Sequence, residues 1–222
     1  MLNRSIGPLV DSMNDNFTLI INAGGQSRRM GQPKALLPLP PTYQPLLQVI
    51  YQRLQQLGPQ RNIIIANDPA IHAQVILPGD PLWLADAYPN TGPLGGLATG
   101  LAAYDRWAIC VACDMPLLNP ALLAYLCTLA VETDPTGVDQ WDAVVPVVDE
   151  HPEALHALYH PRCLSAMLDC LVNGNRRATA FLPAVRVRYV NETELRPFDP
   201  ALLSFYNANT PDEWAQVVAL LT

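Results

Sequence analysis

Short apolar runs alternate along this chain with stretches whose apolar residues recur at helical spacing. Strands are expected at residues 18–23, 62–66, 83–85, 107–113, 143–148 and 185–190. Helices are expected at residues 44–57, 93–104, 121–131, 165–172 and 211–221, the last with Thr210 as its N-cap. This alternation predicts an α/β fold, a three-layer α/β/α sandwich with a Rossmann-like, mostly parallel sheet.

The 222-residue length suits one domain, which we place at residues 17–222. Residues 1–16 contain acids and asparagines without a continuous apolar core, so we expect a flexible N-terminal tail rather than a signal peptide. Pro146 lies inside the expected strand 143–148, which predicts an edge position or a bulge there.

Composition excludes several classes of function. The net charge is −7 and no basic run exists, so binding of nucleic acid by a broad electrostatic surface is not expected. No apolar run reaches the roughly 18 residues that a membrane span needs. Five cysteines, an odd number, indicate a reducing cytoplasm rather than a disulfide framework. Cys110 and Cys113 fall in one strand at an odd separation, which predicts that they face opposite sides of the sheet.

The glycine-rich segment 22–34 is the most informative one. It follows the first expected strand and combines three glycines, two arginines and a lysine, Lys34. Such a loop brings backbone N–H groups and positive side chains to a chain of phosphates, and therefore predicts a nucleotide site. Its spacing differs from that of a P-loop, since Ala35 follows the lysine, and from that of a dinucleotide fingerprint. The alternative is an ordinary turn into a helix.

Asp114 follows the expected strand 107–113, at the sheet edge where α/β proteins bind ligands. A carboxylate there is a natural anchor for Mg²⁺, which completes its shell with water and substrate phosphates. The alternative is a carboxylate that caps the next helix.

The segment 91–97 places two adjacent glycines, Gly95 and Gly96, at the start of a helix. They allow close approach of a flat ligand such as a base or ribose, or alternatively close packing of helix on sheet. Just upstream, Asp86 can accept hydrogen bonds from a purine N1–H and exocyclic amine, a donor pair that guanine offers and that adenine and cytosine lack.

Two amides, Asn207 and Asn209, flank the start of the last expected helix, where they can bind a second substrate, a phosphate or metal-bound water. The alternative is that Asn209 only shapes the turn. His156 and His160 have the i, i+4 spacing of a helical zinc site, but Pro161 follows and no third ligand is evident, so zinc is not expected.

The segment 22–34 resembles the signature A-G-G-x-S-x-R-M-G-x-x-K of the MobA-like nucleotidyltransferases. All four segments follow the order and spacing of the molybdenum cofactor guanylyltransferase family, MobA, over about residues 18–220. His151-Pro152 with 157–159 is similar to that family's H/Q-P…A-L-Y segment, and 174–177 to its G-x-R-R.

The resemblance implies a nucleotidyltransferase-type fold and a role for each matching residue. The implied nucleotide-binding residues are Ala23, Gly24, Gly25, Lys34, Asn67, Asp86 and Asp114, with Asn22 replacing the leucine usual before A-G-G and leaving a polar side chain near the base. The implied catalytic residues are Lys34 on the triphosphate, Asp114 on Mg²⁺ and Arg28, aided by Arg29, on the β- and γ-phosphates. The implied pterin-side residues are Asn207, Asn209, Arg176 and Arg177.

The implied reaction is Mg²⁺-dependent nucleotidyl transfer. The terminal phosphate of molybdopterin attacks the α-phosphate of GTP, pyrophosphate leaves, and the guanine dinucleotide form of the molybdenum cofactor results. GTP and molybdopterin are the expected partners, with cofactor-insertion proteins and chaperones as further candidates.

Three alternatives remain open at this point. A cytidylyltransferase of the same cofactor shares the wording of 31–38, although Ala23-Gly24-Gly25 and the G-P-L-x-G-L segment favour GTP. A guanylyltransferase could act on another phosphorylated acceptor. A non-catalytic cofactor carrier is the third, against which the presence of both Lys34 and Asp114 speaks.

Overall fold

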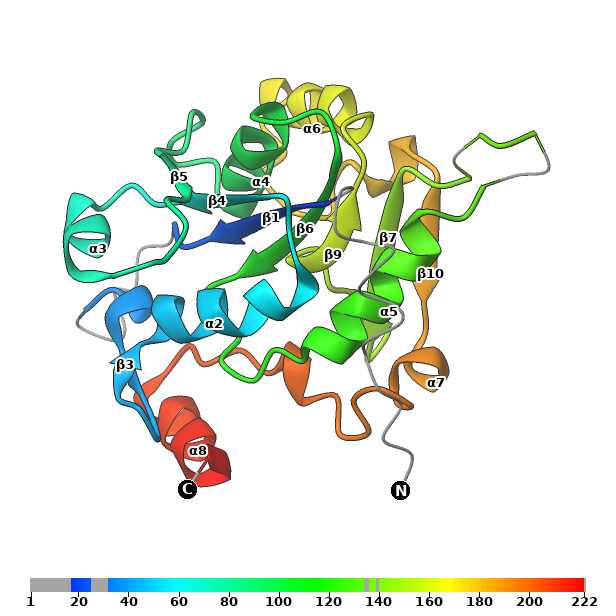
Figure 1. Ribbon diagram of the computed structural model, residues 1–222. Coiled ribbons are helices and arrows are strands. Elements are labelled where there is room, and N and C mark those ends of the chain that lie inside the picture. Colours follow the sequence, from blue (N-terminus) through cyan, green and yellow to red (C-terminus); the bar gives the residue numbers. More distant parts are fainter. Residues whose placement is uncertain (1–16, 25–31, 134–135, 139, 222) are drawn as a thin grey trace.

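A mixed, mostly parallel sheet forms the centre of the computed structural model, which describes residues 17–24, 32–133, 136–138 and 140–221 (Figure 1). The strand order is β10-β7-β9-β6-β1-β4-β5. The strands are β1 (Phe17–Asn22), β4 (Arg61–Ile65), β5 (Leu82–Leu84), β6 (Trp107–Ala112), β7 (Ala143–Val148), β9 (His156–Tyr159) and β10 (Val187–Val190). Only β9 runs against its neighbours in this order, antiparallel to both β6 and β7.

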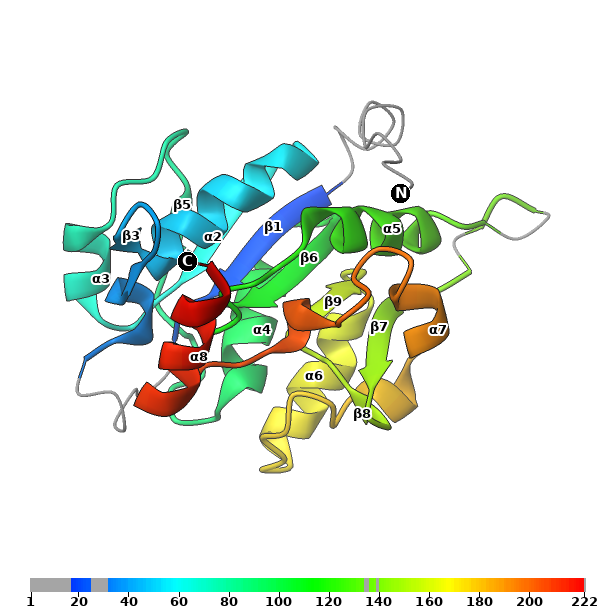
Figure 2. The same ribbon diagram turned by 90° about the horizontal axis from the view of Figure 1, so that it is seen from below.

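Helices cover both faces of the sheet, as the alternating pattern predicts (Figures 1 and 2). The main helices are α2 (Leu46–Leu54), α3 (Pro69–Gln74), α4 (Pro93–Ala102), α5 (Pro120–Ala130), α6 (Cys163–Val172), α7 (Glu192–Leu195) and α8 (Pro211–Leu221). Helices α2 and α5 pack into one core and α4 and α6 into the other. Cys113 lies in the first core and Cys110 in the second, so the prediction that they face opposite sides is confirmed. Within the described ranges, no helix has the length and apolar composition needed to cross a membrane.

Strand β9 was not expected from the sequence. It carries His156, which is fully buried and stacks at a tilt on Phe205, with 4.6 Å between ring centroids. Burial lowers the pKa of His156 to about 3, so this ring is neutral. His160, beyond the end of the strand, instead packs edge-on against Trp107. Neither histidine is on a helix, and the described residues contain no group of three or more His, Cys, Asp or Glu side chains that could hold a metal.

Pro146 is not on an edge strand, so that part of the prediction is wrong. Strand β7 lies between β10 and β9, and its partner changes along its length. Its first residues pair with β9, and Val147 and Val148 pair with the short strand β8 (His151–Pro152). Pro146 lies where pairing passes from β9 to β8, and its carbonyl accepts from the Glu153 N–H at 2.9 Å. Pro146 therefore lies at a change of strand pairing inside the sheet.

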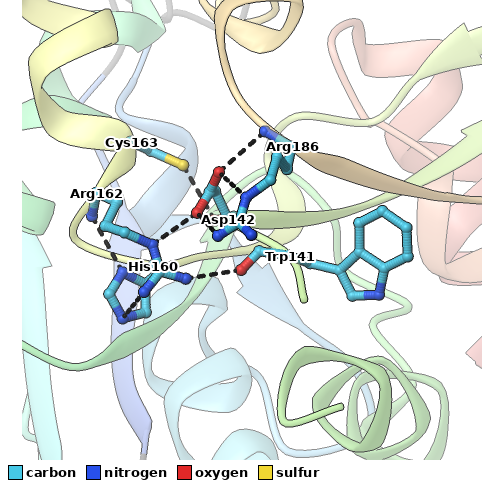
Figure 3. Close-up of polar contacts among 6 residues, drawn as sticks. All are labelled: Trp141, Asp142, His160, Arg162, Cys163 and Arg186. Carbon is cyan, nitrogen blue, oxygen red and sulfur yellow. Dashed lines mark hydrogen bonds and ion pairs between the residues drawn. The ribbon is translucent and has the colours of Figure 1, made fainter. Parts of the chain in front are cut away.

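A buried carboxylate ties three segments together at the end of β7 away from the carboxyl ends of the parallel strands (Figure 3). Asp142 accepts from Arg162 Nε at 2.6 Å and from Arg186 Nε and Nη2 at 3.0 and 2.9 Å. The Arg186 backbone N–H donates to the same carboxylate, and the Cys163 thiol donates to the Asp142 carbonyl. We call these residues, with Trp141 and His160, the Asp142 cluster; it closes the sheet where β7, β9 and β10 meet.

Candidate active site

A cavity of about 1050 Å³ opens at the carboxyl ends of β1, β4 and β6, the edge at which the sequence predicts the site. Seven of the predicted site residues line it: Asn22, Ala23, Gly24, Lys34, Asn67, Asp86 and Asp114. The predicted residues Gly25, Arg28 and Arg29 lie outside the described residues. Because the carboxyl ends of parallel strands meet at one edge of the sheet, groups from four separate parts of the chain lie together there.

Backbone hydrogen bonds hold the strand ends in register around this cavity. The Ala23 N–H donates to the Ile65 carbonyl at 2.8 Å, and the Cys113 N–H donates to the Asn22 carbonyl at 3.0 Å. Cys113 is buried, and this burial raises the pKa of its thiol well above the ordinary value. The thiol beside Asp114 is therefore protonated and supplies no charge to the site.

Asn22 uses its side chain to shape the floor of the cavity. Its Oδ1 accepts from the Gly24 N–H at 3.2 Å, and its Nδ2 donates to the Pro93 carbonyl at the start of α4, at 3.4 Å. A Cβ on Gly96 would lie 2.8 Å from that Nδ2, so glycine is needed where α4 passes Asn22. The polar side chain that replaces leucine here thus ties the glycine loop to α4.

Lys34 lies where three distant segments of the chain meet beside the cavity. It begins a short 3-10 helix, η1 (Lys34–Leu36), and its Nζ lies 2.9 Å from Asp114 Oδ2 and 2.5 Å from Asn209 Oδ1. Two oxygens from distant segments therefore converge on one ammonium. Carboxylate and amide oxygens are also the ligands that Mg²⁺ takes in proteins, so Asp114 and Asn209 fit the expected metal.

The C-terminal segment reaches the site by crossing from α7 to α8 past the end of β6 (Figure 2). The Ala208 N–H donates to the Asp114 carbonyl at 3.1 Å. The Glu213 N–H donates to Thr210 Oγ1 at 3.2 Å, which confirms Thr210 as the N-cap of α8. Glu213 Oε2 accepts from the backbone N–H groups of Asn209 and Thr210, and these bonds lower the pKa of Glu213. The turn holding Asn209 is thus fixed at both ends.

The other residues predicted to face the pterin substrate differ in how closely they approach the cavity. Gly92 lines the cavity, and a Cβ on it would lie 3.3 Å from the Arg176 carbonyl, so the Arg176 backbone borders the rim. Arg177 is exposed, and its N–H donates to Asn175 Oδ1. Asn207 is half-buried, two residues before Asn209.

Asp86 lies in a segment whose backbone is held by side-chain oxygens. Three successive N–H groups donate to side chains: Asp86 N to Asn67 Oδ1 at 2.7 Å, Ala87 N to Thr99 Oγ1 at 3.0 Å, and Tyr88 N to Asp86 Oδ1 at 2.8 Å. Thr99, on α4, was not singled out from the sequence, because a threonine inside a helix carries no distinctive signal.

Gly95 lets the segment 86–91 pack tightly on α4. A Cβ there would lie 2.2 Å from Thr91 Oγ1 and 2.8 Å from the Tyr88 carbonyl. Gly95 and Gly96 therefore make room for protein atoms rather than for a flat ligand, so the packing alternative holds. Their effect on the cavity is indirect: Gly95 leaves room for the Asp86 side chain, and Gly96 leaves room for the Asn22 side chain.

Gly95→Ala should accordingly destabilise the protein and displace Asp86. We expect the free energy of unfolding to fall by about 1–3 kcal/mol, the usual cost of overpacking. Urea unfolding measures this loss. Gly24→Ala is the matched control, because its new Cβ would meet nothing closer than 3.3 Å. Equal losses in the two variants would contradict the packing role of Gly95.

Comparisons of sequence with known proteins lead to one family, and a comparison of structure agrees with its fold. Residues 19–189 match the family model of the MobA-like NTP transferase domain. A molybdenum cofactor guanylyltransferase of Vibrio cholerae is 34% identical over 204 residues, which are 90% of this chain and 91% of the relative. One from Desulfosudis oleivorans is 32% identical over 210 residues, 93% and 96% of the two chains. The structure of molybdopterin-guanine dinucleotide biosynthesis protein A from Archaeoglobus fulgidus superposes with a TM-score of 0.75 at 24% identity, over 91% of this chain and 97% of that one; it supports the fold.

Proposed function

Because the chain belongs to the MobA-like NTP transferase family and is a nucleotidyltransferase, we propose that it transfers GMP from GTP to the terminal phosphate of molybdenum-bound molybdopterin. Pyrophosphate is the second product. The observation that carries this proposal is the convergence of Lys34, Asp114 and Asn209 beside the cavity that Asp86 also lines. The names of the relatives support the choice of acceptor and nucleotide.

Lys34 is the group that stabilises charge on the triphosphate. In nucleotidyl transfer, negative charge is spread over phosphate oxygens, and catalysis comes mainly from positioning and from positive charge fixed in advance. The Lys34 ammonium is already held beside the cavity by Asp114 and Asn209, so a positive charge is in place before the phosphates arrive. The acceptor phosphate is itself anionic, and no side chain has to remove a proton from it.

Asp114 and Asn209 would hold Mg²⁺ through their side-chain oxygens, with water and substrate phosphates completing its shell. When bound, the metal supplies a Lewis acid that neutralises charge on the phosphates. Asn209 lies beside Asp114 because the Ala208 N–H is bonded to the Asp114 carbonyl. The same turn therefore positions the C-terminal residues toward the pterin substrate.

Asp86 and Asn67 would contact the nucleoside. Asn67 Oδ1 accepts from the Asp86 N–H, which leaves the Nδ2 amide group of Asn67 as the donor for a ligand. Tyr88 N–H occupies Asp86 Oδ1, which leaves Oδ2 as the better acceptor for the N1–H and amine of guanine. A donor beside an acceptor matches the O6 and N1–H edge of guanine.

Pyrophosphate release with Mg²⁺ and molybdopterin, alone or carrying molybdenum, tests the proposal when GTP, CTP and ATP are compared. We expect release with GTP only. Release with CTP would move the protein to cytidylyl transfer and overturn the assignment of Asp86. GTP binding without release would favour another phosphorylated acceptor or the carrier function.

A further inference from the structure

The orientation of the Asp86 carboxylate is fixed from α4 as well as from its own segment. Thr99 lies two turns into α4 and is 9% exposed. Its Oγ1 accepts from the Ala87 N–H at 3.0 Å and lies 3.2 Å from Asp86 Oδ1. One hydroxyl thus touches both the backbone next to Asp86 and the Asp86 side chain.

The hydroxyl proton of Thr99 has two acceptors within reach. The Gly95 carbonyl lies at 2.8 Å and Asp86 Oδ1 at 3.2 Å. A hydrogen bond to an ionised carboxylate is about twice as strong as one to a neutral carbonyl, which compensates for the longer distance. In either orientation of the proton, Thr99 still receives the Ala87 N–H. The threonine therefore restrains Asp86 through its backbone and its carboxylate together.

We propose that Thr99 is a positioning residue that sets base selectivity by holding Asp86 Oδ2 toward the nucleobase; this rests on the proposed function. Oδ1 is held by the Tyr88 N–H and the Thr99 hydroxyl, and these two contacts together restrain the direction in which Oδ2 points. Without the hydroxyl, Oδ1 keeps only the Tyr88 bond and the carboxylate can turn about it. Gly95 contributes by leaving room, since a Cβ there would lie 3.0 Å from Asp86 Oδ1.

Guanine and hypoxanthine separate this role from general support of the fold. Both bases offer O6 and N1–H, but hypoxanthine lacks the exocyclic amine. A fixed carboxylate can accept from N1–H and the amine together, whereas a turning carboxylate gains little from the second donor. The ratio of GTP to ITP affinity therefore reports how firmly Asp86 is held.

The experiment is to measure GTP and ITP binding by calorimetry for the wild type, Thr99→Val and Thr99→Ser, after CTP binding has been measured on the wild type. Valine keeps the shape of threonine and removes the hydroxyl, and serine retains it. We expect Thr99→Val to weaken GTP binding about tenfold and ITP binding by less than about threefold. The preference for GTP should thus collapse in the valine variant and return in the serine variant. Asp86→Asn, which removes the charged acceptor, should show the same collapse.

A purely structural role would weaken both nucleotides by the same factor in Thr99→Val, and that result would overturn the proposal, as would an unchanged ratio. If the valine variant does not fold, Thr99→Ala also removes the hydroxyl and adds no bulk. An equal loss of GTP and ITP affinity, or an unchanged ratio, would overturn the proposal in that variant as well. A wild type that prefers neither GTP nor ITP to CTP would instead overturn the proposed function. The wild type is measured before any variant, so failure of the proposed function is distinguished from failure of the role proposed for Thr99.

Discussion

Asp114→Asn should lower the rate of pyrophosphate release by about 10³-fold, at the upper end of the effect of removing one electrostatic contact to a developing charge. Asparagine has the same shape but is neutral, so it binds Mg²⁺ more weakly than a carboxylate does and no longer forms the 2.9 Å ion pair with Lys34. Steady-state pyrophosphate release with GTP and molybdopterin measures the loss. Binding of molybdopterin alone should change little, because the carboxylate acts on the metal and the triphosphate.

Asp105→Asn is the matched control for this variant. It removes one carboxylate from an exposed position beside α4, in a segment that does not line the cavity. Its turnover should equal that of the wild type. Unchanged turnover in Asp114→Asn would show that this aspartate does not hold the metal, and Mn²⁺ binding measured in the same variant would confirm that reading.

Asp142→Ala should lower the free energy of unfolding by about 3 kcal/mol, the lower end of the cost of removing one partner from a buried ion pair. The lower end applies because the side chains of Arg162 and Arg186 are 40% and 52% exposed, so water can replace part of what they lose. Asp142 itself is 8% exposed and joins β7 to the segments beside β9 and β10. Urea unfolding checks the value. Glu192→Ala, which breaks an exposed ion pair with Arg196, should cost much less.

The Asp142 cluster should also make stability depend on pH at acid pH. Burial alone would raise the pKa of Asp142, but the hydrogen bonds from Arg186 and Arg162 outweigh burial and hold the pKa well below its ordinary value of 3.8. A carboxyl with a lowered pKa in the folded state contributes stability above its unfolded pKa and loses it as pH falls toward the folded pKa. Stability should therefore fall below about pH 4. Asp142→Asn should flatten this part of the curve; an identical acid limb in both proteins would exclude Asp142 as its source.

The layers of this fold are predictable because most strands are buried on both faces and read as continuous apolar runs. All six expected strands and all five expected helices are present within a few residues of their predicted bounds. Strand β9 could not be predicted, because it is only four residues long and lies between Pro152 and Pro161, a local pattern that a loop shares. Its pairing is decided by β6 and β7, which are distant in sequence, so only the assembled sheet defines it.

The candidate site divides in the same way. Lys34 could be found because it ends a glycine-rich segment that follows a strand, and Asp114 because it lies just beyond a strand. Both have side chains suited to phosphates or metal. Asn22 was also expected at the site, but its bonds to the Gly24 N–H and the Pro93 carbonyl could not be predicted. Thr99 could not be found at all, because its importance lies in the groups it meets across the fold. Gly95 was correctly seen as a close approach, but the sequence does not say whether the approaching group is ligand or protein.

The ion pair and amide contact at Lys34 also set an order of events during synthesis. Lys34 and Asn209 are 175 residues apart in the chain, so at ribosomal speeds of about 5–20 residues per second the lysine emerges roughly 10–35 seconds before its amide partner. Every strand of the sheet precedes that amide, the last of them ending at Val190. A nascent chain can therefore bury most of the core of this sheet while the candidate site is still incomplete, and the site gains its last contact only after Asn209 has been made.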